Sequence, residues 1–479
     1  MKFEEYRRHD AIGLAGLIAQ KQVSPEEVFE VAINRLDQVN PKLNAVNTDL
    51  RDEARAAIKA GLPNGPLKGV PFLLKDLGVL MKGVRTCGGS RLFKDSAPAA
   101  VDSALVSAYR KAGLVLFGKT NTPEFGMSAA TETVAFGITR NPWDTERTPG
   151  GSSGGTSAAV AAGVVPASHG NDGGGSIRIP AACCGLFGLK PSRGRISSSP
   201  LGDANCGPAI NHVLTRSVRD SALLLDLSCK PVPGDFYWIT PPETPFLKEV
   251  GRDPGKLRIG YVPDPLMWHE MDGEVREATA EAARFCESLG HHVEETKIEF
   301  DFGAYRRAVA PVYMANMTVM FNTEAKRRGR PITRDDLEDM AYAVLEDGRN
   351  VTGAEVAEAY LVYYAMGQTF ARVFEKYDVL LQPTLAQLPV PVGTLRTMNW
   401  PHREVFTDAL YRFMPNTQPY NATGSAAMSV PLAMSKFGLP IGIHFAASPG
   451  AEALLLRLAG QLEAARPWFD RVPPEPANW

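Results

Sequence analysis

The segment Gly173-Gly174-Gly175-Ser176-Ile177-Arg178-Ile179-Pro180 joins three glycines to a serine. Consecutive glycines let the backbone turn tightly, so that several N–H groups can point at one spot, as an oxyanion hole requires. Ser176 ends this loop and is a candidate nucleophile. An anion-binding turn ahead of a helix is the alternative interpretation. A Walker motif is excluded, because no Gly-Lys-Ser/Thr follows the glycines.

Two further segments carry residues that could activate this serine: Leu74-Lys75-Asp76 and Gly150-Gly151-Ser152-Ser153-Gly154-Gly155. Alone, the lysine would be a solvated or salt-bridged residue, and the glycine–serine run would be a linker. A serine hydroxyl, however, needs a base, and a buried lysine can serve because desolvation lowers its pKa. Lys75 follows an apolar run, so burial is expected. Ser152 could then relay the proton.

The three segments together resemble the amidase signature family in order and spacing. The resemblance covers nearly the whole chain and is weakest over about residues 230–375 and 395–420. Other matching stretches are Gly118-Lys119-Thr120-Asn121, Glu124-Phe125, Arg140-Asn141-Pro142-Trp143, residues 188–195, Asp378-Val379-Leu380-Leu381 with Pro383-Thr384, and Gly438-Leu439-Pro440-Ile441-Gly442.

The resemblance implies a catalytic triad. Ser176 would be the acylated nucleophile. Ser152 would follow a cis peptide bond and bridge to the lysine, and Lys75 would act as general base and then as general acid. The oxyanion hole would be formed by the backbone N–H groups of Gly173, Gly174, Gly175 and Ser176. Position 173 departs from the family, which often has threonine there.

The resemblance also implies residues that bind substrate or support the loop. Gly126 and Ser128 would line the acyl side of the pocket together with Ser152. Three residues are expected to hold the loops through hydrogen bonds rather than to contact substrate: Asp172, Arg178 and Ser153. The middle and late segments contain methionine and aromatic residues whose helical spacing favours a core role over a pocket role: Tyr313, Met314, Met317, Met320, Phe321, Tyr411, Phe413, Met414 and Tyr420.

Composition excludes several classes of protein. The net charge is −2 and no basic run is interleaved with aromatic residues, which argues against a nucleic-acid partner. The six cysteines form no CxxC pair and the histidines no HExxH motif, so neither disulfides nor a metal site are expected. No stretch approaches the ~20 apolar residues of a membrane span. We expect a cytoplasmic protein that needs no metal and no organic cofactor.

At 479 residues the chain exceeds the usual size of a single core. Short apolar runs alternate with helical patterns after residue 66, which predicts an α/β fold with a parallel or mixed sheet. The resemblance makes this the amidase signature fold: a large central twisted mixed β-sheet flanked by helices, with a helical insertion. Four segments are expected: 1–65, helical and packed on the core; 66–230, the signature core; 231–376, a connector and mostly helical subdomain; and 377–479, strands and a helix that complete the sheet.

The resemblance implies an amidohydrolase that cleaves C–N amide bonds. The segment His169-Gly170-Asn171-Asp172 is similar to that of hydrolases of cyclic 6-aminohexanoate dimers, the nylon oligomers, and of urethane-cleaving amidases. We therefore expect small, mostly uncharged amides, carbamates or esters as substrates. Two alternatives stay open: the glutaminase subunit of a tRNA-dependent amidotransferase, and a catalytically idle binding protein on the same fold. A homodimer is also left open.

Overall fold

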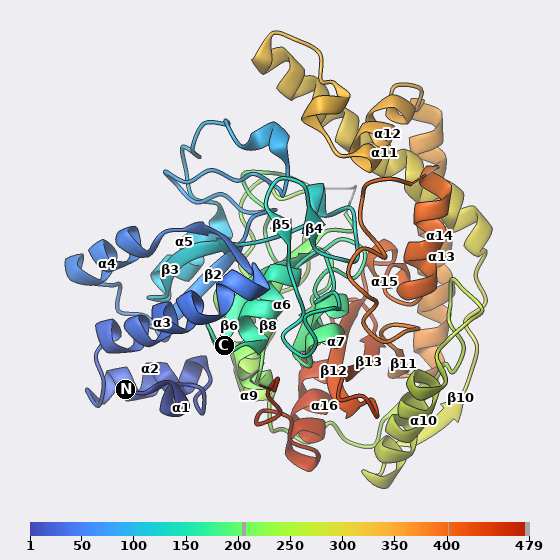
Figure 1. Cartoon of the computed structure of the whole chain (residues 1–479). Helices are drawn as coiled ribbons and strands as arrows, with labels where there is room; N and C mark the ends of the chain where they lie inside the picture. The colour runs from blue at the N-terminus through green and yellow to red at the C-terminus, as the bar shows by residue number, and fades with distance from the viewer. Residues whose placement is uncertain (204–206, 401, 475–479) are drawn as a thin grey trace.

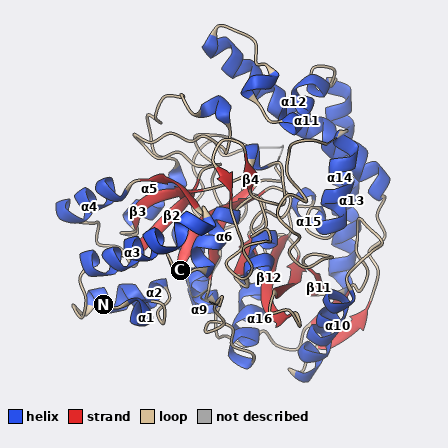
Figure 2. Cartoon of the chain, in the orientation of Figure 1, coloured by secondary structure: helices blue, strands red, loops and turns tan. Residues whose placement is uncertain are grey.

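A computed structural model describes residues 1–203, 207–400 and 402–474. Its centre is a mixed sheet of eleven strands in the order β1-β3-β2-β6-β8-β7-β12-β13-β11-β9-β10 (Figures 1 and 2). β4 and β5 form a separate pair. The strands are β1 Val46–Asp49, β2 Pro71–Lys75, β3 Val115–Thr120, β4 Glu132–Thr133, β5 Gly137–Ile138, β6 Ala167–Asp172, β7 Phe187–Lys190, β8 Ile210–Thr215, β9 Arg258–Tyr261, β10 His292–Glu295, β11 Val379–Pro383, β12 Ala426–Met434 and β13 Pro440–Ala447.

Helices surround this sheet (Figure 2). They are α1 Phe3–Tyr6, α2 Ala11–Ala19, α3 Pro25–Leu43, α4 Arg51–Ala60, α5 Ala104–Lys111, α6 Gly154–Ala161, α7 Arg178–Cys184, α8 Val218–Ser228, α9 Phe246–Glu249, α10 Gly273–Ser288, α11 Phe302–Arg328, α12 Asp339–Gly348, α13 Gly353–Lys376, α14 Arg403–Phe413, α15 Pro419–Ala422 and α16 Glu452–Ala465. Helix starts follow ordinary capping chemistry. At the start of α3, Ser24 accepts from Glu27 N–H, and Glu27 accepts from Ser24 N–H in return.

Both parallel and antiparallel pairs occur, as the sequence predicted. β2 pairs in parallel with β3 and β6, and β9 pairs in parallel with β10 and β11. The pairs from β6 through β8, β7, β12 and β13 to β11 are antiparallel. The alternation of strands and helices therefore yields a mixed α/β sheet, and the α/β prediction is confirmed.

The division into four segments stays a prediction, but the sheet crosses one of its boundaries. β9 and β10 lie within residues 231–376, the stretch expected to be mostly helical, and they form one edge of the central sheet. The helical part proper is α11, α12 and α13, which lie along one side of the molecule (Figure 1). The last five residues of the expected segment 377–479 lie outside the described residues.

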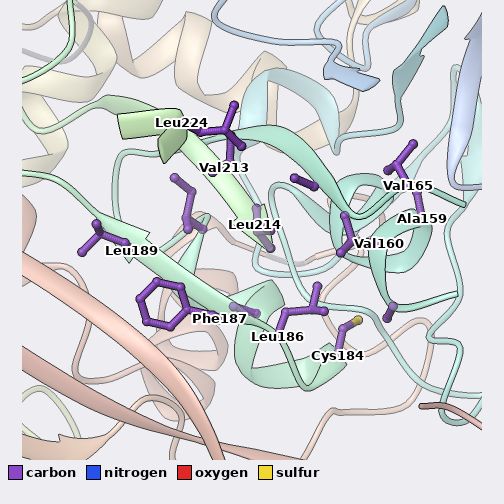
Figure 3. Close-up of a cluster of buried hydrophobic side chains, with 14 of the residues drawn as sticks. Ala159, Val160, Val165, Cys184, Leu186, Phe187, Leu189, Val213, Leu214 and Leu224 are labelled. Carbon is purple, nitrogen blue, oxygen red and sulfur yellow. The ribbon is translucent and has the colours of Figure 1, made fainter. Parts of the chain in front are cut away.

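The core beneath the glycine-rich loops is apolar and closely packed. Figure 3 shows part of this core, a cluster of buried side chains that includes Val160 and Val165, from α6 and the turn after it, and Leu186 and Phe187, where the chain enters β7. All four are at most 2% exposed. α6 begins just after Ser152, and α7, which leads into β7, begins just after Ser176. Each candidate catalytic serine is thus attached to a buried helix, which fixes its position.

Within the described ranges, no helix is both long and apolar enough to span a membrane.

Candidate active site

Lys75 ends β2 and is completely buried. Its Nζ lies 2.7 Å from Ser152 Oγ, 3.0 Å from Ser153 Oγ and 2.6 Å from Asn171 Oδ1. Desolvation lowers the pKa of Lys75 well below its ordinary value, and the charge of Asp172 opposes this shift only in part. The amine therefore loses its proton far more easily than a surface lysine does.

The three contacts define where the lone pair of a neutral Lys75 amine points. Asn171 Nδ2 donates to Leu77 O at 2.9 Å, which leaves Oδ1 facing the lysine as an acceptor. The Ser153 hydroxyl donates to Asn171 O at 3.2 Å, so its oxygen is also an acceptor toward Nζ. A neutral amine has two N–H donors and one lone pair. With both N–H groups directed at these acceptors, the lone pair faces the Ser152 hydroxyl, which suits proton transfer from Ser152.

Ser152 has the backbone geometry that the family resemblance implied, because the Gly151–Ser152 peptide bond is cis. Thr131 supports this loop by donating from Oγ1 to Gly150 O at 2.9 Å. The structure thus brings the end of β2 and the loop before α6 together around one buried amine.

Asn171 and His169 were assigned no individual role from the sequence, yet both contact Lys75. His169 Nδ1 accepts from the Lys75 backbone N–H at 3.1 Å, and burial lowers the pKa of His169 to about 3. It is therefore neutral and helps to position the end of β2. One signal could have found the pair: residues 169 and 171 alternate along β6, so both point to the same face of the sheet.

The loop that ends at Ser176 is organised by a buried ion pair, as expected for Asp172 and Arg178. The Asp172 carboxylate accepts from Arg178 Nε and Nη2, both at 2.9 Å, and from Ile177 N–H at 3.2 Å. Burial alone would raise the pKa of Asp172, but the Arg178 charge and its hydrogen bonds hold that pKa below its ordinary value. Asp172 is therefore ionised and keeps the loop in one conformation.

The expected oxyanion hole needs one correction. Gly175 N–H donates to Asp172 Oδ1 at 2.7 Å, so it is not available to a substrate. Asp172 is fully buried and its carboxylate needs donors, which explains why it captures this N–H. In the described part of the chain, the N–H groups of Gly173, Gly174 and Ser176 have no hydrogen-bond partner. These three can serve as donors.

Ser176 opens into a cavity of about 950 Å³ that Ser152, Gly126 and Ser128 also line. Among the described residues, the Ser176 hydroxyl has no hydrogen-bond partner. The Ser128 hydroxyl also donates to Leu395 O at 2.7 Å and accepts from Ala130 N–H at 3.1 Å. These hydrogen bonds tie the Ser128 side chain to the backbone of two other segments at the cavity wall.

The cavity wall is largely apolar and comes from α11, α14 and the residues around them. Six of the methionine and aromatic residues line the cavity: Tyr313, Met314, Met317, Met320, Tyr411 and Met414. Four of these six, Met314, Met317, Tyr411 and Met414, are also buried in hydrophobic clusters, as the preference for a core role predicted, and Tyr313 and Met320 are partly buried against such a cluster. The other three are buried outside it: Phe321, Phe413 and Tyr420. A helix that packs along the rim of a cavity turns one side of its apolar surface to the core and another to the cavity, and sequence spacing does not separate the two.

Charged side chains that line the cavity are mostly paired. Arg306 pairs with Asp408 at 2.7 Å, and Arg403 pairs with Asp347 at 2.9 Å. Arg307 is exposed and has no ion-pair partner among the described residues. Among the described residues that line it, the cavity therefore holds no buried, unpaired arginine that would select a carboxylate substrate.

The chain is similar to known amidases over nearly its whole length. A family model described as Amidase matches residues 27–456. The chain is 38% identical over 480 residues to a 6-aminohexanoate-cyclic-dimer hydrolase from Pseudomonas sp. (strain NK87), covering 97% of this chain and 96% of that protein. It is 34% identical over 474 residues to an acylamidase from Rhodococcus erythropolis, covering 97% of this chain and 96% of that protein. A solved structure of 6-aminohexanoate cyclic dimer hydrolase superposes with a TM-score of 0.91 at 35% identity, covering 97% of this chain and 98% of that one.

Proposed function

The chain belongs to the amidase family, and on that premise we propose that it hydrolyses C–N amide bonds through an acyl-enzyme on Ser176. Ser152 and Lys75 serve as the proton relay. The observation that carries this proposal is the buried Lys75 amine, which lies 2.7 Å from Ser152 Oγ, and Ser152 lines the same cavity as Ser176.

Acylation begins with neutral Lys75 taking the proton of Ser152 as Ser152 takes the proton of Ser176. Ser176 Oγ bonds to the carbonyl carbon, and the C=O electron pair moves onto oxygen. The N–H groups of Gly173, Gly174 and Ser176 stabilise that oxyanion. As the C=O bond reforms, the C–N bond breaks, and the proton held on Lys75 returns through Ser152 to the leaving nitrogen, which departs as an amine.

Deacylation repeats the same steps with water as the nucleophile. The Lys75–Ser152 relay takes a proton from water, the hydroxyl oxygen bonds to the acyl carbon, and the Ser176 C–O bond breaks. Ser176 recovers its proton and the acid is released. Esters and carbamates react in the same way, because the first attack is identical.

The substrates we propose are small and mostly uncharged amides, with carbamates and esters as further candidates. Support comes from the apolar cavity wall built from α11 and α14. It also comes from the two ion pairs that neutralise Arg306 and Arg403, which pair with Asp408 and Asp347 respectively. Relatives named as a cyclic-dimer hydrolase and an acylamidase fit a substrate of this kind. We also propose that the enzyme works in the cytoplasm, without a cofactor or a nucleic-acid partner.

The test measures p-nitroaniline release from short acyl anilides and p-nitrophenol release from a small carbamate, with free glutamine as a third substrate. Wild type is expected to turn over anilide or carbamate, and Ser176→Ala to lose all turnover while folding normally. Ser107→Ala, a serine change on α5 outside the cavity, is the matched control and should keep full activity. Glutaminase activity alone would instead support an amidotransferase subunit, and no turnover of any substrate would contradict the proposal.

A further inference from the structure

Gln418 lies directly on the loop that supplies the oxyanion donors. A Cβ atom placed on Gly174 would lie 3.1 Å from Gln418 Cγ and 3.2 Å from Gln418 Nε2. Gly174, Ser176 and Gln418 all line the same cavity. The absence of a side chain at position 174 is therefore what lets the glutamine amide approach this loop.

One end of the Gln418 amide is held by a residue of α11. Tyr305 is a buried residue of α11, and its hydroxyl donates to Gln418 Oε1 at 3.2 Å. Because Oε1 is held by Tyr305, Nε2 is the end of the amide that lies over Gly174. No protein acceptor for Nε2 is found among the described residues. Its N–H donors are free to bind a molecule in the cavity.

The backbone that carries Gln418 is fastened to the same loop. Thr417 donates from Oγ1 to Gly174 O at 2.6 Å, and Arg178 Nη1 donates to Thr417 O at 2.9 Å. Gln418 therefore keeps its place relative to Gly174 without a substrate. Such preorganisation is what a transition-state donor requires, since no reorganisation is then needed as charge develops.

We propose that Gln418 Nε2 is a further donor of the oxyanion hole and binds the carbonyl oxygen of the bond that is cut. The inference rests on the proposed acyl transfer at Ser176. Gln418 Nε2 would replace the Gly175 N–H, which cannot bind the oxyanion because it donates to Asp172 Oδ1. Gln418 is thus a catalytic residue, and Tyr305 is a positioning residue that acts through it.

The test follows a reaction that does not depend on the natural substrate, the phosphonylation of Ser176 by a small alkyl fluorophosphonate. The Ser176 O–P bond forms, the P–F bond breaks and fluoride leaves, while the proton of Ser176 passes through Ser152 to Lys75. The developing charge on the phosphoryl oxygen occupies the oxyanion hole. The labelling rate, followed by intact-protein mass spectrometry, is therefore a direct measure of its donors.

Gln418→Met removes the donor at similar size and should slow labelling about 100-fold, with a matching fall in kcat for an anilide and little change in KM. Gln418→Glu should be slower still, because an ionised carboxylate repels the oxyanion. Tyr305→Phe should cause a smaller loss, and the double variant Tyr305→Phe/Gln418→Met should be no slower than Gln418→Met alone. That lack of additivity would identify one functional unit.

The chain offers a matched control on its surface, where Gln368 Nε2 donates to the Tyr364 hydroxyl at 3.1 Å on an exposed face of α13. Gln368→Met and Tyr364→Phe should label at the wild-type rate. A labelling rate of Gln418→Met within twofold of the wild-type rate, or a change in this variant that is confined to a higher KM for the anilide, would overturn the inference and leave the proposed function standing. Failure of wild type to label at Ser176 would overturn both. If Gln418→Met does not fold, the Tyr305→Phe variant is the test instead. A labelling rate of Tyr305→Phe equal to that of the wild type would overturn the inference.

Discussion

Asn171 Oδ1 lies 2.6 Å from Lys75 Nζ, and the same amide is fixed by its hydrogen bond to Leu77 O. An uncharged acceptor at this position satisfies one N–H of the amine without stabilising its protonated form as a carboxylate would. Burial can therefore lower the pKa of Lys75, as the proposed base role requires.

Asn171→Asp tests this relationship. A carboxylate beside the amine should raise the pKa of Lys75 by ~1–3 units. Lys75 would stay protonated to higher pH, so the acid limb of the kcat–pH profile should move to higher pH and activity at neutral pH should fall. The profile is measured with an anilide from pH 5 to 10. Asn350→Asp, at an exposed position, is the control and should leave the profile unchanged. An unmoved acid limb in Asn171→Asp would argue that another group limits the rate.

Arg178→Met should strongly destabilise the protein, because it leaves the buried Asp172 carboxylate without its cation. We expect a loss of ~3–5 kcal/mol in the free energy of unfolding at pH 7, measured in urea. Arg258→Met breaks an exposed ion pair with Asp378 and should cost ~0–1 kcal/mol.

The same comparison has a pH signature. In the wild type the pKa of folded Asp172 lies below its unfolded value, so its contribution is present above the unfolded pKa and is lost as pH falls. Without Arg178, burial should raise the folded pKa, and stability would then be lost as pH rises. The destabilisation should therefore be smaller at pH 4 than at pH 7. An equal loss at both values would contradict an ionised Asp172 held by Arg178.

Gly175→Ala should remove activity. Its backbone has φ +131°, which side chains rarely adopt, and the added Cβ would lie 2.6 Å from Ile179 Cδ1 and closer still to Thr417 Oγ1. The loop would have to move, which displaces Ser176 and the N–H donors, so kcat should fall by at least about 100-fold. Gly16→Ala in α2 meets no atom within 4 Å and should keep full activity. Comparable kcat values in the two variants would show that the loop tolerates the change.

Glu124→Gln should flatten the pH dependence of stability. Desolvation, with the charge of Glu338, raises the pKa of Glu124 to about 8 from an unfolded value of 4.5. The folded state therefore holds a proton that the unfolded state releases. The contribution of Glu124 to stability is full below pH 4.5 and is lost as pH rises through about 8, by up to ~1.4 kcal/mol per pH unit.

Urea unfolding at several pH values between 5 and 8.5 measures the difference between wild type and Glu124→Gln. Other buried carboxyl groups titrate in the same range, but they are common to both proteins and cancel in that difference. Glu53→Gln, on an exposed face of α4, is the control and should parallel the wild type. A difference that does not change with pH would contradict the raised pKa.

Local sequence patterns were sufficient for most of the elements. The run after Ser24-Pro25-Glu26-Glu27 forms α3, and the apolar run before Lys75 is β2. Near residue 334, Thr333 and Asp336 close a separate short turn through hydrogen bonds with each other, and α12 begins only at Asp339. Each of these outcomes depends on hydrogen bonds within a few residues, which the sequence expresses directly.

The sequence by itself determined the order and spacing of Lys75, Ser152 and Ser176 and of the glycines around them, because glycines permit such a loop and a buried lysine can serve as such a base. The tertiary structure decided which atoms meet. It brought Asn171 Oδ1 within hydrogen-bond distance of Lys75 Nζ and directed the Gly175 N–H to the Asp172 carboxylate. It also turned part of the methionine and aromatic surface of α11 toward the cavity. The physical reason is that hydrogen bonds and packing between strands and helices distant in the chain depend on how the whole sheet is assembled, and no local pattern encodes that assembly.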